Sequence, residues 1–527
     1  MKLKKLAALV LAGCMTLSMA ALAEEQTPDP SISEGKTLIV GLQGDPASFN
    51  PTAAPDDWGY YVAENMFSRL VKLNWSGEPL PDLAESWDIP EDGMTVTFHL
   101  HQDAKWSDGE PVTSADVKWT FDKIIEEQAY LVSYLGSVES IEATDEYTVV
   151  FHMSSPDAAL LSNLAFLGAF IMPEHVYEGQ DWMSCEAATT SPVTSGPFML
   201  DEYNQGVSVS LTANKEYYGG APAYEKLIYQ IIPDGNTAVQ AYNNGELDVL
   251  GIMAPASQIP SLESDTGNVV VRNTNFGRYY YGFNVKSEAL SDVKVREAIT
   301  MAIDRAEIVE KAFGASGKLA EGYYTPAVEW AYNADAQIPA FDQEQAIALL
   351  EEAGLTKDGD GNYLTLSIAT FNLEPFTNIA QIMQANLASI GVKLDINTME
   401  AAAFMEIGAD ESAYDLFAMG GQVGPDPSMF YHRIGTNGMM NFSHYSNEEV
   451  DAMFDEAAGM TDQEARGDLY KKIQDICAQD FIFVPLSEDI GINVYKTYLT
   501  GLPYDTSVDK AAQTEMTYVM FTEEPQY

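Results

Sequence analysis

Hydrophobic and polar residues alternate at positions 94–101, and this pattern predicts a β-strand with one buried face. Its apolar positions run from Met94 to Leu100, and threonine and histidine lie between them. A second alternating segment covers residues 147–153 and predicts another strand. Shorter apolar runs predict further strands at residues 37–41, 226–232, 364–370 and 392–396. Strands are therefore expected along the whole chain.

Apolar residues spaced three and four positions apart predict helices between these strands. Thr113 and Asp116 have the spacing of a capping box, and the apolar stripe of a helix follows them as far as Ile125. Gly354 and Gly391 stand where two later helices should end. The last predicted helix lies between two predicted strands, so we expect a β-α-β unit and a mixed α/β fold. The later helices are expected at residues 237–243, 293–313, 341–353 and 379–390.

The beginning of the chain has the pattern of an export signal. Residues 1–23 start with lysines, continue as an apolar run and end in small residues before Glu24, which is typical of a secretory signal peptide. Residues 24–35 are rich in Pro, Ser and Glu and are expected to form a flexible tether. Cys14 ends the tract Leu-Ala-Gly-Cys, so lipidation of this cysteine is an alternative to cleavage after Ala23. Both interpretations place the protein outside the cytoplasm, in the periplasm or at the cell surface.

Charge and cysteine content exclude several classes of protein. The formal charge of −52 becomes −55 when the three lysines of the signal are removed. Such acidity repels phosphate backbones, so no nucleic-acid partner is expected. Cys185 and Cys477 remain after removal of the signal, and they can form at most one disulfide. No apolar run after the signal reaches the roughly 18 residues needed to span a bilayer.

The sequence lacks the spacings of familiar catalytic and nucleotide-binding sites. No serine stands in G-x-S-x-G, H-E-x-x-H does not occur, and Gly317-Lys318 is followed by Leu319 where a phosphate loop needs Ser or Thr. His99 and His101 share a strand face, but no carboxylate or cysteine is placed by sequence to complete a metal site. We therefore expect no catalytic residue, no cofactor and no metal.

The tract WSDGEPVTSADV, at residues 106–117, resembles a marker of the large solute-binding proteins of bacterial ABC transporters. The resemblance is to the oligopeptide-, dipeptide- and nickel-binding family, and it covers nearly all of the chain after the signal. Further matching tracts are YYYGFN at 279–284, SDVKVREAI at 291–299, AIDR at 302–305, LLEEAG at 349–354 and DPS at 426–428.

The resemblance implies a bilobal, periplasmic-binding-protein-like fold of the large cluster that carries an extra subdomain. Two mixed-sheet α/β lobes would be joined by hinge strands, and the ligand would be enclosed between them and delivered to a membrane permease. The implied protein is a monomer. The expected boundaries are 36–67, 192–275 and 488–527 for lobe I, 68–191 for the extra subdomain, and 276–487 for lobe II.

The resemblance also places candidate ligand-binding residues in the first half of the chain and in one hinge strand. Asp56, Asp57 and Trp58 lie in a loop that corresponds to a cleft-lining segment, and the alternative is a capped loop that packs on its own lobe. Tyr279 and Tyr281 lie in a tyrosine-rich strand that we expect to be mostly core, with one hydroxyl reaching the cleft. Tyr134 is a further candidate.

The loop at residues 419–427 bears on the class of ligand. In the family's peptide binders, an aspartate shortly before the acidic-Pro pair holds the α-ammonium of the peptide. That position falls here on Val423 or Gly424, and Asp426 is expected to cap the loop. The remaining candidate in this loop is Gln422. Two tryptophans of the family are also replaced, by Gly421 and Ala401.

These replacements remove the side chains that usually hold the peptide in this family. Either Asp56 or Asp57 holds the amine instead, or the ligand has no free amine. We expect an ABC-importer binding protein for a peptide-like solute. The alternatives are a binding protein for an oligosaccharide, a metal chelate or another small polar solute, a signalling receptor on the same fold, and a secreted hydrolase.

Overall fold

The computed structural model describes residues 30–53, 56–74, 77–166, 168–504 and 514–525. The signal and Cys14 lie outside these residues. Residues 30–35 were expected to belong to the tether, but α1 (Pro30–Ser33) forms there. Ser33 is buried, and its hydroxyl accepts a hydrogen bond from Phe521 N at 2.9 Å. This contact with the end of the chain holds the segment on the folded body.

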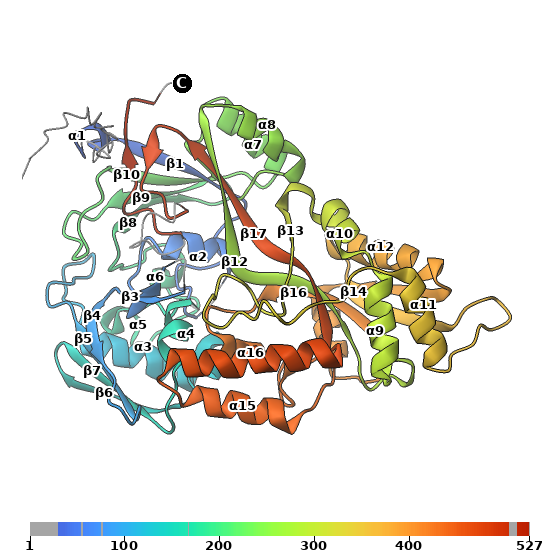
Figure 1. Ribbon diagram of the computed structural model, residues 1–527. Coiled ribbons are helices and arrows are strands. Elements are labelled where there is room, and N and C mark those ends of the chain that lie inside the picture. The colour runs from blue at the N-terminus through green and yellow to red at the C-terminus, as the bar shows by residue number, and fades with distance from the viewer. Residues whose placement is uncertain (1–29, 54–55, 75–76, 167, 505–513, 526–527) are drawn as a thin grey trace, which may run out of the picture.

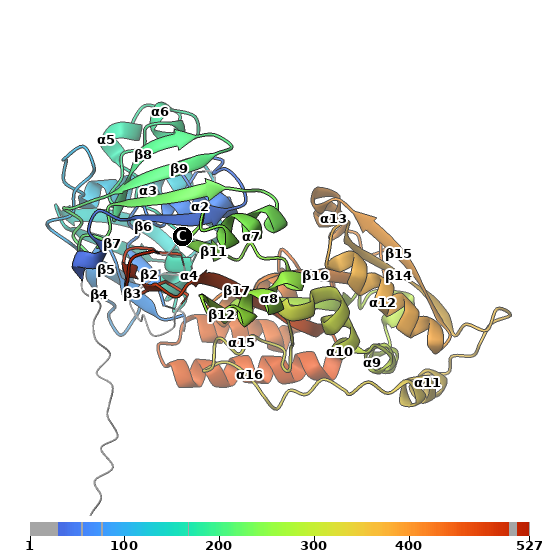
Figure 2. The same ribbon diagram turned by 90° about the horizontal axis from the view of Figure 1, so that it is seen from above.

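One mixed sheet of eleven strands runs through both lobes. Its order is β15-β14-β16-β12-β17-β11-β1-β10-β9-β8, and β13 pairs with β17 beside this path. Figure 2 shows β8 and β9 at one end of the molecule and β14 and β15 at the other, with β12 and β17 between them. The bilobal α/β fold is therefore confirmed. The strands are β1 (Thr37–Leu42), β8 (Phe198–Asn204), β9 (Ser208–Ala213), β10 (Lys226–Ile231), β11 (Val249–Gly251), β12 (Asn268–Phe283), β13 (Gly317–Leu319), β14 (Leu364–Phe371), β15 (Val392–Met399), β16 (Leu416–Gln422) and β17 (Phe483–Lys496).

The strands β12 and β17 connect the two lobes. They are 16 and 14 residues long and pair antiparallel from Asn268 opposite Lys496 to Gly282 opposite Phe483. At one end β17 pairs with β11 of lobe I, and at the other β12 pairs with β16 of lobe II. Figure 1 shows these two strands crossing the middle of the molecule as long ribbons.

Lobe I is built on β1, which pairs parallel with β10. The C-terminal part of the chain returns to this lobe, because Leu499, Met516 and Phe521 contribute to the same hydrophobic core as Leu38. Its helices and small sheet are α2 (Asp57–Ala63), α7 (Gly235–Asn243), α8 (Ile259–Ser264), β18 (Leu499–Thr500) and β19 (Met520–Phe521).

A four-stranded antiparallel sheet, in the order β4-β5-β7-β6, forms the centre of the extra subdomain. It confirms the two alternating strands predicted from the sequence. The capping box is also confirmed, since Thr113 N donates to Asp116 Oδ2 at 2.8 Å ahead of α3. The subdomain contains β2 (Val71–Leu73), β3 (Pro79–Pro81), β4 (Ala84–Asp88), β5 (Thr95–Leu100), α3 (Ser114–Glu126), β6 (Val138–Asp145), β7 (Thr148–Met153), α4 (Leu160–Phe166), α5 (Glu174–Tyr177) and α6 (Glu186–Thr189).

Lobe II contains the predicted β-α-β unit. The strands β14 and β15 pair parallel, with Leu364 opposite Val392, and α12 connects them. Gly354 and Gly391 have φ angles of 84° and 79°, and this left-handed conformation is the one in which helices commonly end on glycine. The remaining helices of the lobe are α9 (Val293–Ala302), α10 (Arg305–Ile308), α11 (Gln343–Glu352), α12 (Phe376–Ser389), α13 (Ala401–Ile407), α14 (Tyr431–Ile434), α15 (Glu448–Ala458) and α16 (Gln463–Asp480).

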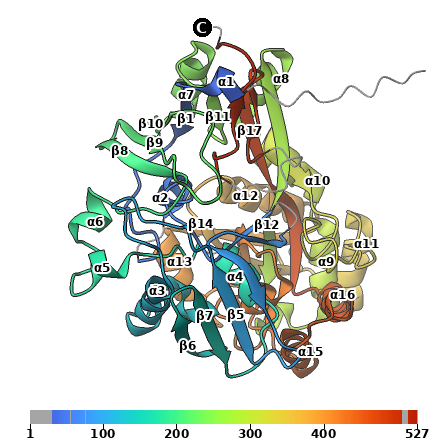
Figure 3. The same ribbon diagram turned by 90° about the vertical axis from the view of Figure 1, so that its left-hand side faces the viewer.

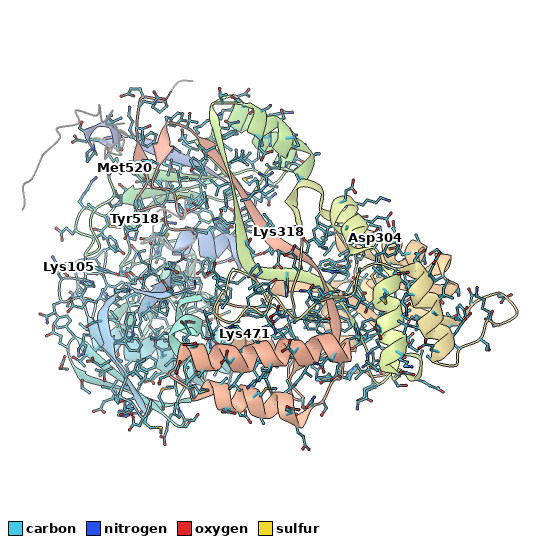
Figure 4. The ribbon with its side chains drawn as sticks, viewed as in Figure 1. Lys105, Asp304, Lys318, Lys471, Tyr518 and Met520 are labelled. Atoms are coloured by element: carbon cyan, nitrogen blue, oxygen red, sulfur yellow. The ribbon has the colours of Figure 1, made fainter. Side chains whose placement is uncertain are left out.

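The prediction of a single helix at residues 293–313 is wrong. The helix α9 ends at Ala302, Ile303 is extended, and α10 begins after Asp304, which is labelled in Figure 4. The Asp304 carboxylate accepts from Glu307 N at 3.0 Å, while Asp304 N donates to the Asn386 side chain at 2.8 Å. A side-chain cap and a tertiary contact therefore start a new helix where the apolar stripe continues without interruption.

Cys185 and Cys477 are both free thiols, so the disulfide considered from the sequence does not form. Among the helices of the described residues, none combines the length and the apolar character needed to cross a membrane.

Candidate ligand-binding cleft

A bulge between the two crossover strands marks the candidate site. Thr274 pairs with Ile490 and Arg278 pairs with Glu488, so three residues of β12 stand opposite Asp489 alone. Bulges of this kind redirect side chains and are common beside functional sites. Phe276, in the middle of the bulge, is buried in the core of lobe II, whereas its two neighbours lie beside Asp489.

Two neutral amides bind the Asp489 carboxylate. Asn275 Nδ2 donates to Asp489 Oδ2 at 3.3 Å, and Gln422 Nε2 donates to the same oxygen at 3.4 Å. Within the described part of the chain, no lysine, arginine or histidine forms an ion pair with this carboxylate. Burial raises the pKa of Asp489, and the two amides oppose that rise. Asp489 is thus a partly buried acid without a protein cation beside it.

The charge of Asp489 acts on two tyrosines. Burial raises the pKa of Tyr61, in α2, to about 12, with further contributions from Asp57, Glu64 and Asp489. Burial also raises the pKa of Tyr279, and Asp489 adds to the shift. Asp489 therefore interacts with one phenol of lobe I and one of the crossover strand β12.

The loop at residues 56–58 contains one capped helix start and one exposed acid. Asp56 Oδ1 accepts from Gly59 N at 2.8 Å, and Oδ2 accepts from Ala47 N at 3.0 Å. Asp57 is exposed in the first turn of α2. Asp56 is therefore occupied by local backbone groups, and the side chain of Asp57 faces solvent.

Trp58 packs on its own lobe. A Cβ on Gly44 would lie 2.6 Å from the Trp58 ring, and the ring centroid is 6.4 Å from that of Tyr61. The indole is only partly buried, so it adds an aromatic surface next to Tyr61.

Three of the candidate residues are buried, and for Tyr281 this agrees with the expectation that its strand is mostly core. Tyr281 and Val423 both have 0 % exposure and belong to the cores of lobe II. Tyr281 lies there because alternate residues of β12 face the core, and its ring packs on Phe283 at 5.7 Å. Gly424 is closed off by Met429, whose sulfur lies 2.0 Å from the position of a Cβ on this glycine. None of the three presents a side chain to a ligand in this structure.

Asp426 is held in a buried ion pair. Arg466 Nη2 and Nη1 donate to its two oxygens at 2.9 and 3.1 Å, and Asp426 Oδ1 also caps a short 3₁₀ helix through Ser428 N at 3.0 Å. A ligand ammonium at Asp426 would have to displace a bidentate guanidinium, which is unfavourable for a buried pair.

Tyr134 lies where the subdomain approaches lobe II. Its ring centroid is 5.7 Å from that of His432 in α14, at an interplanar angle of 75°. Burial lowers the pKa of His432, so the ring is neutral at neutral pH. This contact joins the extra subdomain to lobe II.

A groove of about 1130 Å³ separates the extra subdomain from the α15 and α16 side of lobe II. Its walls include Pro156, Leu161, Trp330 and Asp426. Ala158 N donates to Ala458 O at 3.0 Å, and this bond ties the subdomain to α15. Figure 3 shows the subdomain strands beside α15. The groove does not include Trp58, Tyr61, Gln422 or Asp489, so it is separate from the acid at the bulge.

The histidines considered for a metal site have separate partners. His99 Nε2 lies 2.9 Å from Asp88 Oδ2, and His152 Nε2 lies 3.2 Å from Glu142 Oε2. The described residues contain no group of three or more metal-ligating side chains.

A family model for bacterial extracellular solute-binding proteins, family 5 Middle, matches residues 78–442. The chain belongs to this family. A Brucella ovis protein provisionally named as an ABC transporter peptide-binding protein is 32% identical over 452 residues, or 82% of this chain and 80% of the relative. Oligopeptide-binding protein AppA of Bacillus subtilis is 27% identical over 517 residues, covering 92% and 94% of the two chains. The crystal structure of the ABC transporter substrate-binding protein CtaP of Listeria monocytogenes superposes with a TM-score of 0.81 and 26% identity, over 93% of this chain and 100% of that one.

In this family 5 solute-binding protein, sequence reasoning missed Asp489, Asn275 and Tyr61. The first two residues meet only because β12 and β17 pair across more than 200 positions with a bulge in the register. A signal was present in the sequence, since Glu488 and Asp489 place two acids inside an otherwise apolar segment. Of the expected residues, Gln422 contacts Asp489, and the charge of Asp489 contributes to the raised pKa of Tyr279.

Proposed function

We propose that this protein binds a peptide-like solute between its lobes and delivers it to the permease of an ABC importer. The names of its relatives in Brucella and Bacillus support a peptide as the solute. The observation that carries the proposal is the partly buried acid at the bulge, which Asn275 and Gln422 hold and which has no ion-pair partner among the described residues. A cleft that offers aromatic surface and a few polar groups is typical of a solute-binding site.

Closure of the lobes is the proposed mechanism of capture. The strands β12 and β17 are the direct backbone connections that the large sheet makes between the lobes, so bending at the bulge changes the angle between them. Tyr61 would move with lobe I, while Gln422 would move with lobe II. A solute that contacts both sides favours the closed form by its differential affinity for it.

No covalent step is part of this proposal. The sequence lacks the catalytic spacings named above, and its family consists of solute-binding proteins. We further propose that the protein acts as a monomer outside the cytoplasm, after cleavage at Ala23 or after lipidation at Cys14. Both positions lie outside the described residues. Mass spectrometry of the mature N-terminus distinguishes the two forms.

Native mass spectrometry of the purified protein tests the proposed solute. Binding proteins with a closed cleft often retain ligand from the cell, so a mixture of peptide masses released on denaturation is expected. A single sugar or chelate mass would instead favour the alternative ligands. Incubation with peptide and glycoside substrates serves as the control, and turnover of either would overturn the non-catalytic assignment.

Uptake measurements test the transport role. Deletion of the gene should abolish accumulation of a labelled peptide, and the full-length protein should restore it. A deletion strain that accumulates the peptide normally but loses a response to it would indicate a signalling receptor instead.

A further inference from the structure

The family's usual ammonium ligand is absent from this chain, and the structure shows that its position has no space for one. Val423 is buried with its amide bonded to Phe276 O at 2.6 Å, and Met429 fills the space beside Gly424. Two other candidate acids are also engaged, because Asp426 is bound by Arg466 and Asp56 by two backbone amides. A free peptide amine therefore needs a different partner.

Asp489 has the properties of that partner. It lies on β17 opposite the bulge in β12, and both amide donors, Asn275 and Gln422, bind its Oδ2. Among the described residues none donates to Oδ1, and the side chain is only partly buried. One carboxylate oxygen is thus fixed by the protein and the other is left for a donor from outside.

The backbone beside Asp489 is adapted to this arrangement. A Cβ on Gly277 would lie 2.8 Å from Asp489 Oδ2 and 3.2 Å from Gln422 Nε2. Only glycine leaves enough space for the carboxylate and the amide to meet above the strand. The bulge therefore lets the exposed Gln422 side chain reach the partly buried Asp489.

The surroundings favour a cation at this position. Tyr61 and Tyr279 keep their protons, because burial and the charge of Asp489 raise both pKa values. Arg278 bonds Glu488 at 2.7 Å inside the core, and Lys318, which lies opposite Glu488 on β13, forms no ion pair with Asp489 in the described structure.

We infer that Asp489 binds the α-ammonium of the peptide ligand and replaces the family's aspartate from a different strand. This inference rests on the proposed function and specifies the ligand, which is a peptide with a free N-terminus. A charge-assisted hydrogen bond from the ammonium to Oδ1 would complete the coordination of the carboxylate. N-blocked peptides and uncharged oligosaccharides lack the group that this acid would bind.

Binding of two matched peptide sets tests the assignment. The first is an equimolar mixture of tri- and pentapeptides with free amines, and the second contains the same peptides N-acetylated. Wild-type protein freed of retained ligand by unfolding and refolding should prefer the free amines, and Asp489→Asn should weaken their binding about 10- to 100-fold. The same substitution should leave the affinity for acetylated peptides unchanged, so the two sets should become nearly equal.

Two further variants serve as comparison and control. Asp57→Asn alters the exposed acid of α2 and should retain the preference for free amines. Asp395→Asn changes an exposed acid on β15, whose partner is Lys393 at 2.9 Å, and should behave like the wild type. Equal thermal melting of all variants shows that the fold is intact.

The outcomes test the anchor, which is binding of the ligand ammonium by Asp489, separately from the proposed function of peptide binding. Wild-type protein that binds neither set would overturn the peptide proposal, and the anchor with it. Wild-type protein that binds both sets equally, or Asp489→Asn that retains the preference, would overturn the anchor and leave peptide binding in place. Loss of the preference in Asp57→Asn alone would assign the amine to α2 instead.

Discussion

Arg466 binds both carboxylate oxygens of Asp426, at 2.9 and 3.1 Å, in a pair whose side chains are only 6% and 4% exposed. The guanidinium carbon also lies 5.3 Å from the ring centre of Trp330 and 5.6 Å from that of Tyr470. The loop that follows β16 is thereby fastened to α16. This acid contributes to stability and is not available to a ligand.

Replacement of Arg466 by alanine should destabilise the protein strongly, because it leaves the Asp426 carboxylate buried without a partner. Loss of one member of a buried pair typically costs about 3–5 kcal/mol. A urea unfolding curve followed by tryptophan fluorescence measures the change. Lys393→Ala is the matched control, since Lys393 forms a solvent-exposed pair, and it should unfold almost like the wild type. Equal midpoints for the two variants would show that the buried pair does not stabilise lobe II.

Gly277→Ala should impair ligand binding without unfolding the chain. The added methyl group would approach Asp489 Oδ2 to 2.8 Å, so the carboxylate and the Gln422 amide must move apart. We expect binding of free-amine peptides to weaken about tenfold. Calorimetric titration gives the affinity and circular dichroism reports the fold. Gly359→Ala is the control, because no heavy atom lies within 4 Å of its Cβ position. Wild-type affinity in Gly277→Ala would contradict the importance of this geometry.

The affinity for free-amine peptides should fall as the solution becomes acidic. Burial raises the pKa of Asp489, so the carboxylate takes up a proton at a higher pH than an ordinary aspartate and then no longer attracts an ammonium. Tyr61 and Tyr279 stay neutral throughout, because their pKa values are raised. The other charged groups nearby are Asp57, Glu488 with Arg278, and Lys318 on β13, which is labelled in Figure 4.

Stability of the ligand-free protein should show the opposite trend for this group. Because the folded state binds the Asp489 proton more tightly than the unfolded chain, the contribution of Asp489 to stability declines as the pH rises through its folded-state pKa.

Calorimetric titrations at a series of pH values, with wild type and Asp489→Asn, measure the effect of pH on the affinity for free-amine peptides. A wild-type affinity that does not change with pH, or the same pH dependence in the variant, would contradict the role of Asp489.

The two thiols of the chain from Glu24 onward should react at different rates. Cys477 is fully buried in α16, and burial raises the pKa of its thiol, so little reactive thiolate forms. Cys185 is partly exposed. Brief treatment with N-ethylmaleimide should therefore modify Cys185 alone, and urea should allow modification of both. Cys185→Ser is the control and should stay unmodified until unfolding. Equal modification of both cysteines in the native protein would show that α16 opens readily.

Local sequence patterns predicted much of the scaffold. The capping box at Thr113 and Asp116 and the β-α-β unit around α12 depend on neighbouring residues, so the sequence contained the information needed to place them. The helix at residues 293–313 was mistaken for a different reason. Asp304 N donates to Asn386, which is 82 residues away, and no periodicity within the segment reveals that contact.

The site was predicted less completely, because it depends on strand register. Alternation in β12 places Tyr279 and Tyr281 on the same face, and both pack on the same core of lobe II, with Tyr281 inside it and the partly buried Tyr279 at its edge. The register shift that matters for the site lies between Thr274 and Arg278, where the extra residues of β12 bring Asn275 to Asp489. Register shifts of this kind arise from pairing between distant segments and cannot be read from either strand alone.

The position of Asp489 on β17 links occupancy to mechanics. The acid lies on one of the two strands that must flex when the lobes rotate, and not on a wall that moves toward a fixed solute. A bound ligand that neutralises the charge of Asp489 therefore acts directly on a strand that connects the two lobes. A permease that senses the angle between the lobes would then respond to the charge state of the Asp489 side chain.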